Sequence, residues 1–130
     1  MAYVHPILGL LSVLLMCWVA LNGLRSRHKA RYALKARRLH HRVAPWIYLL
    51  WAITLAVGWA STTWIRSDIH AGSTKHFVAA WASLVVFGIA ALLSLRVPQA
   101  PWARRIHPWF GIAGVVIALT LAALGMTLLP

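Results

Sequence analysis

Four long apolar runs divide this sequence and leave only short stretches between them. A helix needs about 20 residues to cross the hydrocarbon core of a membrane, so each run is long enough for one crossing. The runs lie at approximately 5–24, 43–65, 76–95 and 107–129. We therefore expect an all-α integral membrane protein in which residues 1–130 form one domain.

The composition also indicates a membrane protein. Hydrophobic residues make up 62% of the 130 residues, and the mean hydropathy is +0.75. About half of the residues of a soluble domain are apolar. Short connections place consecutive helices side by side and antiparallel, so the sequence predicts an up-down-up-down four-helix bundle.

Positive charge is concentrated in two of the three connections. The chain has 13 Lys and Arg residues and one acidic residue, which gives a net charge of +12. Eight of the cations lie in 25–42, three flank the third connection, and two lie in the second. Basic loops stay on the cytoplasmic side of a membrane. We therefore expect 25–42 to be a cytoplasmic loop, within which Arg31 to Arg42 can continue a helix past the membrane surface. Both termini are expected to lie on the non-cytoplasmic side.

This charge distribution also indicates what the chain contacts. A basic surface beside apolar spans favours anionic membrane lipid over nucleic acid as the partner. The same surface can attract an anionic redox carrier, or dock the chain onto a larger membrane complex.

Each of the four runs has a histidine near its entry, followed one helical turn later by a small residue. The combinations are His5 with Gly9, His40 with Ala44, His76 with Ala80 and His107 with Gly111. Positions i and i+4 share a helix face. A porphyrin bound to a helical histidine lies against that helix, and a small residue at the next turn leaves space for it. The spacing therefore predicts four haem ligands with four cofactor-lining neighbours.

The alternating direction of the spans places the four histidines at two depths in the membrane, which we call levels. His5 and His76 begin their runs on one side of the membrane, and His40 and His107 begin theirs on the other. In an antiparallel four-helix bundle these are the diagonal pairs, with side chains in the shared core. We expect His5 and His76 to be the axial iron ligands of one haem b, and His40 and His107 those of a second.

Two of these ligands have an alternative in the sequence. His41 is adjacent to His40, but Pro45 stands at its fourth position, and the helix phase favours His40. His70 lies in the connection before His76 and can replace it if that connection folds inward. The glycines deeper in the runs are interpreted as packing residues, because small residues allow helices to approach closely; they are Gly58, Gly88, Gly114 and Gly125.

Other features limit the chemistry. Cys17 is the only cysteine and the haem-attachment pattern C-x-x-C-H is absent, so both haems are expected to be non-covalent. The sequence shows no catalytic carboxylate pair, nucleophile with its base, phosphate-binding loop or cysteine metal cluster. Two axial imidazoles favour electron transfer over oxygen chemistry. We therefore expect an electron-transfer protein or an oxidoreductase subunit rather than a stand-alone catalyst.

The four histidines, their small neighbours and the hydropathy profile resemble the cytochrome b561 family. The layout also resembles small four-helix membrane proteins of cyanobacteria and plastids. The first resemblance implies two b haems on diagonal histidine pairs near opposite membrane faces, and electron transfer between a donor and an acceptor that the sequence does not identify. Together the resemblances imply a prokaryotic inner membrane or a thylakoid-type membrane.

A function of a different class also fits the sequence. The chain can be a pigment- or haem-binding structural subunit of a photosynthetic or respiratory membrane complex. In that case its histidines bind chlorophyll magnesium or a single haem. The eight tryptophans and the interfacial histidines are compatible with this alternative.

Overall fold

The structure is a computed structural model that describes residues 3–28, 31–65, 70, 72 and 74–127. Its helices are α1 (Val4–Arg25), α2 (Tyr32–Trp64), α3 (Lys75–Arg96) and α4 (Pro101–Met126). Each of them is long and apolar enough to cross a membrane. The described residues contain no strand. The prediction of an all-α membrane bundle of four helices is therefore confirmed.

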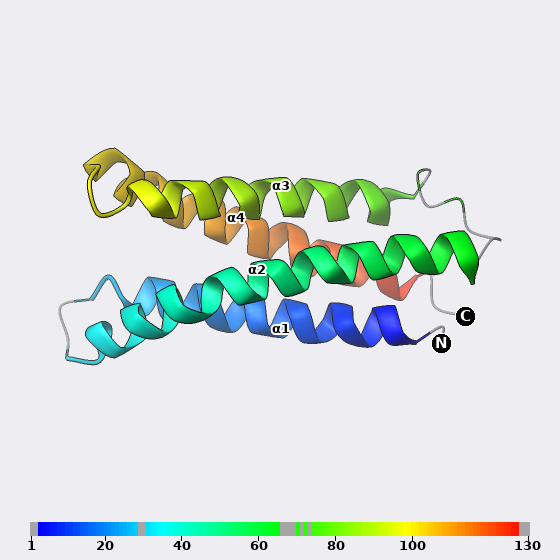
Figure 1. The fold of residues 1–130 in the computed structure, drawn as a ribbon, viewed down its shortest axis with the longest axis horizontal. Coiled ribbons are helices and arrows are strands. Elements are labelled where there is room, and N and C mark those ends of the chain that lie inside the picture. The colour runs from blue at the N-terminus through cyan, green and yellow to red at the C-terminus, as the bar shows by residue number, and fades with distance from the viewer. Residues whose placement is uncertain (1–2, 29–30, 66–69, 71, 73, 128–130) are drawn as a thin grey trace.

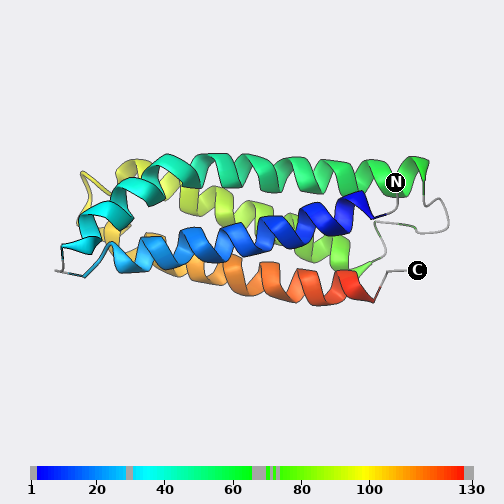
Figure 2. The same cartoon turned by 90° about the horizontal axis from the view of Figure 1, so that it is seen from below.

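The helices run alternately up and down along one long axis (Figure 1). The start of α1, the end of α2, the start of α3 and the end of α4 lie at one end of the bundle (Figure 2). The end of α1, the start of α2, the end of α3 and the start of α4 lie at the opposite end. Helix α1 packs closely on α2, and α3 on α4. Helix α1 also packs on α4, whereas α2 makes few contacts with α3. The diagonal partners are therefore α1 with α3, and α2 with α4.

Two helices begin earlier than the apolar runs do. Helix α2 starts at Tyr32, inside the basic segment 25–42, where the sequence allowed a helix over Arg31 to Arg42. Ala, Leu, Lys and Arg dominate its first three turns, and these residues favour helix even outside the membrane. Helix α4 starts at Pro101, six residues before His107. Proline is well suited to a first helical turn, where its missing N–H costs no hydrogen bond.

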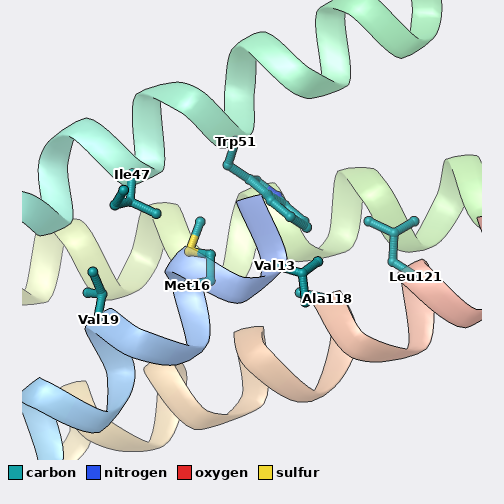
Figure 3. Packing of buried hydrophobic residues seen from close by; sticks show 7 residues of the cluster. All are labelled: Val13, Met16, Val19, Ile47, Trp51, Ala118 and Leu121. Atoms are coloured by element: carbon teal, nitrogen blue, oxygen red, sulfur yellow. The ribbon is translucent and has the colours of Figure 1, made fainter. Parts of the chain in front are cut away.

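The core is a cluster of apolar side chains from α1, α2 and α4, shown in Figure 3; it consists of Val13, Met16, Val19, Ile47, Trp51, Ala118 and Leu121. Trp51 is 3% exposed, and its Nε1 donates a hydrogen bond to Ser83 Oγ at 3.1 Å. Its ring meets Phe87 of α3 edge to face, with 6.1 Å between the ring centroids. Close packing and internal hydrogen bonds hold helices together in lipid, where the hydrophobic effect between them is absent.

Large apolar side chains cover the outside of the bundle. Each helix exposes several, for example Leu14, Ile53, Val85 and Leu119. Such a surface is unsuited to water but matches the hydrocarbon of a membrane. Within the described part of the chain, every buried side-chain nitrogen or oxygen has a hydrogen-bond partner. Both properties are those of an integral membrane protein.

Candidate metal centres

The four predicted ligand histidines lie in two facing pairs. His5 of α1 and His76 of α3 form the first pair, with 6.0 Å between ring centroids and 89° between ring planes. His40 of α2 and His107 of α4 form the second pair, at 6.1 Å and 80°. Each pair joins two diagonally opposite helices. The structure therefore brings together the residues that the sequence assigned to each level.

The separation within each pair suits two imidazoles on opposite sides of one metal ion. A bond from a histidine nitrogen to a metal ion is about 2 Å long, and the centre of the ring lies about 1 Å behind that nitrogen. Two axial imidazoles therefore have centroids about 6 Å apart. The observed values, 6.0 and 6.1 Å, agree with this distance.

Each pair offers two ligands and no more. Among the described residues, no group of three or more His, Cys, Asp or Glu side chains is placed to hold a metal ion. A protein-bound zinc ion takes three or four such ligands, so a bare ion is a poor match for either pair. A metal inside a macrocycle needs only its axial ligands from the protein. The donor set therefore fits a haem.

In both pairs, the Nδ1 atom of each histidine is held by a backbone carbonyl of the neighbouring helix. The four hydrogen bonds measure 2.9–3.1 Å and join His5 to Thr54, His40 to Val19, His76 to Leu121, and His107 to Ala90. A carbonyl oxygen only accepts, so Nδ1 carries the proton and donates it. This leaves a lone pair on Nε2, which is the tautomer that a metal ligand requires.

The carbonyl partners follow one register. Each lies 14 residues after the histidine of its own helix: Val19 after His5, Thr54 after His40, Ala90 after His76, and Leu121 after His107. In each hairpin, α1–α2 or α3–α4, each helix thus carries one histidine and provides the backbone carbonyl that accepts a hydrogen bond from the histidine of the other helix. A helix rises about 1.5 Å per residue, so the two levels are about 21 Å apart along the bundle.

Glycines of the neighbouring helices leave room for three of the imidazoles. Gly58 lies against His5, Gly23 against His40, and Gly125 against His76. A Cβ atom added to any of these glycines would lie only 2.5–3.0 Å from the Cε1 atom of its histidine. Each glycine follows the acceptor carbonyl by four residues, which places both on one helix face. The corresponding position beside the fourth histidine is Ser94.

Sequence reasoning gave these glycines no role at the metal centres. It interpreted Gly58 and Gly125 as packing residues and did not single out Gly23. A signal was present, because in three of the four helices a glycine follows the histidine by 18 residues. This spacing could not be interpreted from the sequence, because each glycine contacts the histidine of the neighbouring helix and only the fold shows how the two helices are aligned.

The small residues on the histidines' own helices lie away from the imidazole contacts. A Cβ built on Gly9 or Gly111 meets no atom within 4 Å. Ala44 and Ala80 are partly buried and pack against the core cluster. The expectation that these four residues line a porphyrin stays a prediction.

The two alternative ligands lie outside the pairs. His41 is exposed on α2, and its ring centroid is 5.8 Å from that of His40. His70 is exposed in the connection between α2 and α3. The only acidic residue, Asp68, lies outside the described residues.

Comparison of this chain with protein-family models, with curated proteins and with solved structures gives no match. The two histidine pairs and the side chains between them are therefore the features from which we infer a function. Trp51 and Phe87 occupy the region between the two pairs. Trp51 lies three residues before Thr54, whose carbonyl accepts from His5, and Phe87 lies three residues before Ala90, whose carbonyl accepts from His107.

Proposed function

We propose that this chain is a membrane cytochrome that binds two haem b groups and transfers electrons from one membrane face to the other. The observation that carries the proposal is the geometry of the two pairs: rings about 6 Å apart with every Nδ1 bonded to a carbonyl. The resemblance to cytochrome b561 agrees with it and extends only to His5, His40, His76 and His107.

The residues of each pair hold and orient the cofactor. A bound haem supplies a one-electron redox centre. In the first pair, His5 and His76 would hold the haem iron through Nε2, while the carbonyls of Thr54 and Leu121 fix the ring orientations and raise the basicity of Nε2. Imidazoles on both sides leave no open position for oxygen, so the pair favours electron transfer.

The region between the two levels is packed rather than open. Trp51 is about one helical turn from Thr54, whose carbonyl binds His5, so it lies nearer the first pair. Phe87 is about one turn from Ala90, whose carbonyl binds His107, so it lies nearer the second pair. Their rings are in contact, and Trp51 is tied to Ser83. This packing excludes water from the interior between the two proposed centres.

The proposed orientation of the chain in the membrane follows from the charges of the connections. The basic end of the bundle, beside the second pair, faces the cytoplasm or its equivalent, and the first pair lies near the opposite face. The membrane is a prokaryotic inner membrane or a thylakoid-type membrane under this proposal.

Haem content and the absorption spectrum test the function. The purified chain is expected to carry two haems, with sharp alpha and Soret bands that shift on reduction by dithionite. His5→Ala and His107→Ala are each expected to retain one haem, whereas His28→Ala, at an exposed position outside the pairs, retains two. Absence of a chromophore would contradict the proposal. A red chlorophyll band would contradict it as well and favour the structural pigment-binding subunit.

A further inference from the structure

A cleft of about 410 Å³ lies between the end of α1 and the start of α2. The exposed side chains of Arg25, Tyr32 and Lys35 line its mouth, and the less exposed Asn22, Ala36 and Leu39 line its floor. None of the paired histidines lines it. The cleft is therefore distinct from the two candidate metal centres.

The two cations of the cleft have no carboxylate partner in the described structure. Arg25 and Lys35 are exposed, and the described residues include no Asp or Glu. The one acidic residue of the sequence, Asp68, lies outside the described residues. An anion from outside the described chain can therefore pair with these two cations.

The beginning of α2 adds hydrogen-bond donors at the same place. Its N-cap residue, Arg31, makes no side-chain capping bond, and its first turn contains no acidic residue. The N–H groups of a first helical turn have no partner within the helix and carry the positive end of the helix dipole. Arg25, Lys35 and the Tyr32 hydroxyl line the cleft beside this helix start and are donors that suit a phosphate.

The surroundings indicate a phosphate that belongs to a lipid. The cleft lies where two membrane-spanning helices emerge into a strongly basic segment, which is the depth of lipid headgroups. Leu21 and Leu24, the sequence neighbours of Asn22 and Arg25, are exposed and offer an apolar surface on α1 for acyl chains. Ala36 and Leu39 give the floor an apolar character.

We propose that this cleft binds the phosphate of one anionic phospholipid, with Arg25 and Lys35 pairing the charge and Tyr32 donating to a phosphate oxygen. The glycerol backbone rests on the apolar floor, and the acyl chains follow α1 into the membrane. The binding is independent of haem, so its test stands whether or not the proposed cytochrome function is correct.

Lipid titration followed by native mass spectrometry of the detergent-solubilised full chain tests this proposal. The wild type is expected to retain one phosphatidylglycerol at least tenfold more tightly than phosphatidylcholine. The double variant Arg25→Gln/Lys35→Gln is expected to lower that affinity about tenfold or more, since each cation near an anionic headgroup contributes substantially. Tyr32→Phe, which removes one donor, is expected to lower it about threefold.

The matched control removes an equal number of positive charges at positions that do not line the cleft. Arg27 and Arg38 are exposed and do not line it, so Arg27→Gln/Arg38→Gln is expected to change the affinity less than about twofold. Equal losses in the two double variants would overturn the proposal in favour of a diffuse basic surface. Displacement of the lipid by millimolar inorganic phosphate would overturn it in favour of a soluble-anion site. Circular dichroism checks that all variants keep their helical content.

Discussion

Each paired histidine is fixed on its Nδ1 side by a backbone carbonyl, and three of the four also lie against a glycine. An imidazole held in this way loses little further freedom when Nε2 binds a metal. A Cβ added at such a glycine would press on the imidazole that donates its Nδ1 proton to the carbonyl. Single substitutions at these contacts therefore act on one level at a time.

Gly58→Ala is expected to remove the haem of the first pair and leave the other. Its Cβ would lie 2.5 Å from Cε1 and 2.8 Å from Nδ1 of His5, so the imidazole must leave the carbonyl of Thr54. Haem content per chain should fall from two to one. In Gly72→Ala, the new Cβ meets nothing within 4 Å, and both haems should remain. Two haems with an unchanged spectrum in Gly58→Ala would contradict this role of Gly58.

Trp51→Ala is expected to destabilise the bundle by about 3–5 kcal/mol, the usual cost of removing a buried large aromatic side chain. The variant loses the contact with Phe87 and the hydrogen bond to Ser83. Denaturant unfolding in detergent measures the difference. Trp46 is on the same helix and 68% exposed, so Trp46→Ala should cost less than about 1 kcal/mol. Equal costs would show that Trp51 is not a packing centre.

At the scale of the helices, the phase of α2 decides which of two adjacent histidines enters the core. Successive residues of a helix point about 100° apart. The structure turns His40 toward His107 and leaves His41 exposed. His40→Ala is therefore expected to remove the haem of the second pair, and His41→Ala to keep both haems. The reverse result, read from haem content per chain, would mean that α2 is rotated from the position described.

The helix boundaries show what the sequence can and cannot predict. Hydropathy located the four spans, because length and apolar character are local properties. Hydropathy alone does not mark the start of α2 at Tyr32, since a helix that continues beyond the hydrocarbon no longer needs an apolar composition. The helix-favouring residues of Arg31 to Arg42 were the signal that a helix can continue there.

The contacts of the paired histidines show the same limit. The sequence indicated which histidines share a level, because chain direction alternates from span to span. It could not indicate the carbonyl of Val19 or the role of Gly23, because a carbonyl carries no side-chain identity and both contacts depend on how far one helix slides along its neighbour.

At the scale of the whole molecule, the chain consists of two hairpins built on the same register. Each hairpin supplies one histidine to each pair, so neither pair is complete within one hairpin. Hairpins α1–α2 and α3–α4 meet mainly through α1 and α4. The association of the two hairpins therefore creates both proposed centres together.

The orientation of the bundle is a further prediction at this scale. The cations of the first and third connections should keep those connections in the cytoplasm of a bacterial host, with both termini outside. Alkaline phosphatase fused to the C-terminus should then be active, and green fluorescent protein at the same point should be dark. The same reporters inserted after Arg27 should give the opposite result. An inactive phosphatase at the C-terminus would reverse the proposed sides of the two pairs.

The diagonal pairing is tested most directly by haem content in two double variants of the full chain. His5→Ala/His76→Ala removes both ligands of one pair and is expected to retain one haem. His5→Ala/His40→Ala removes one ligand from each pair and is expected to retain none. The opposite outcome, no haem in the first variant and one haem in the second, would contradict the account, because it would place the two ligands of a haem within one hairpin.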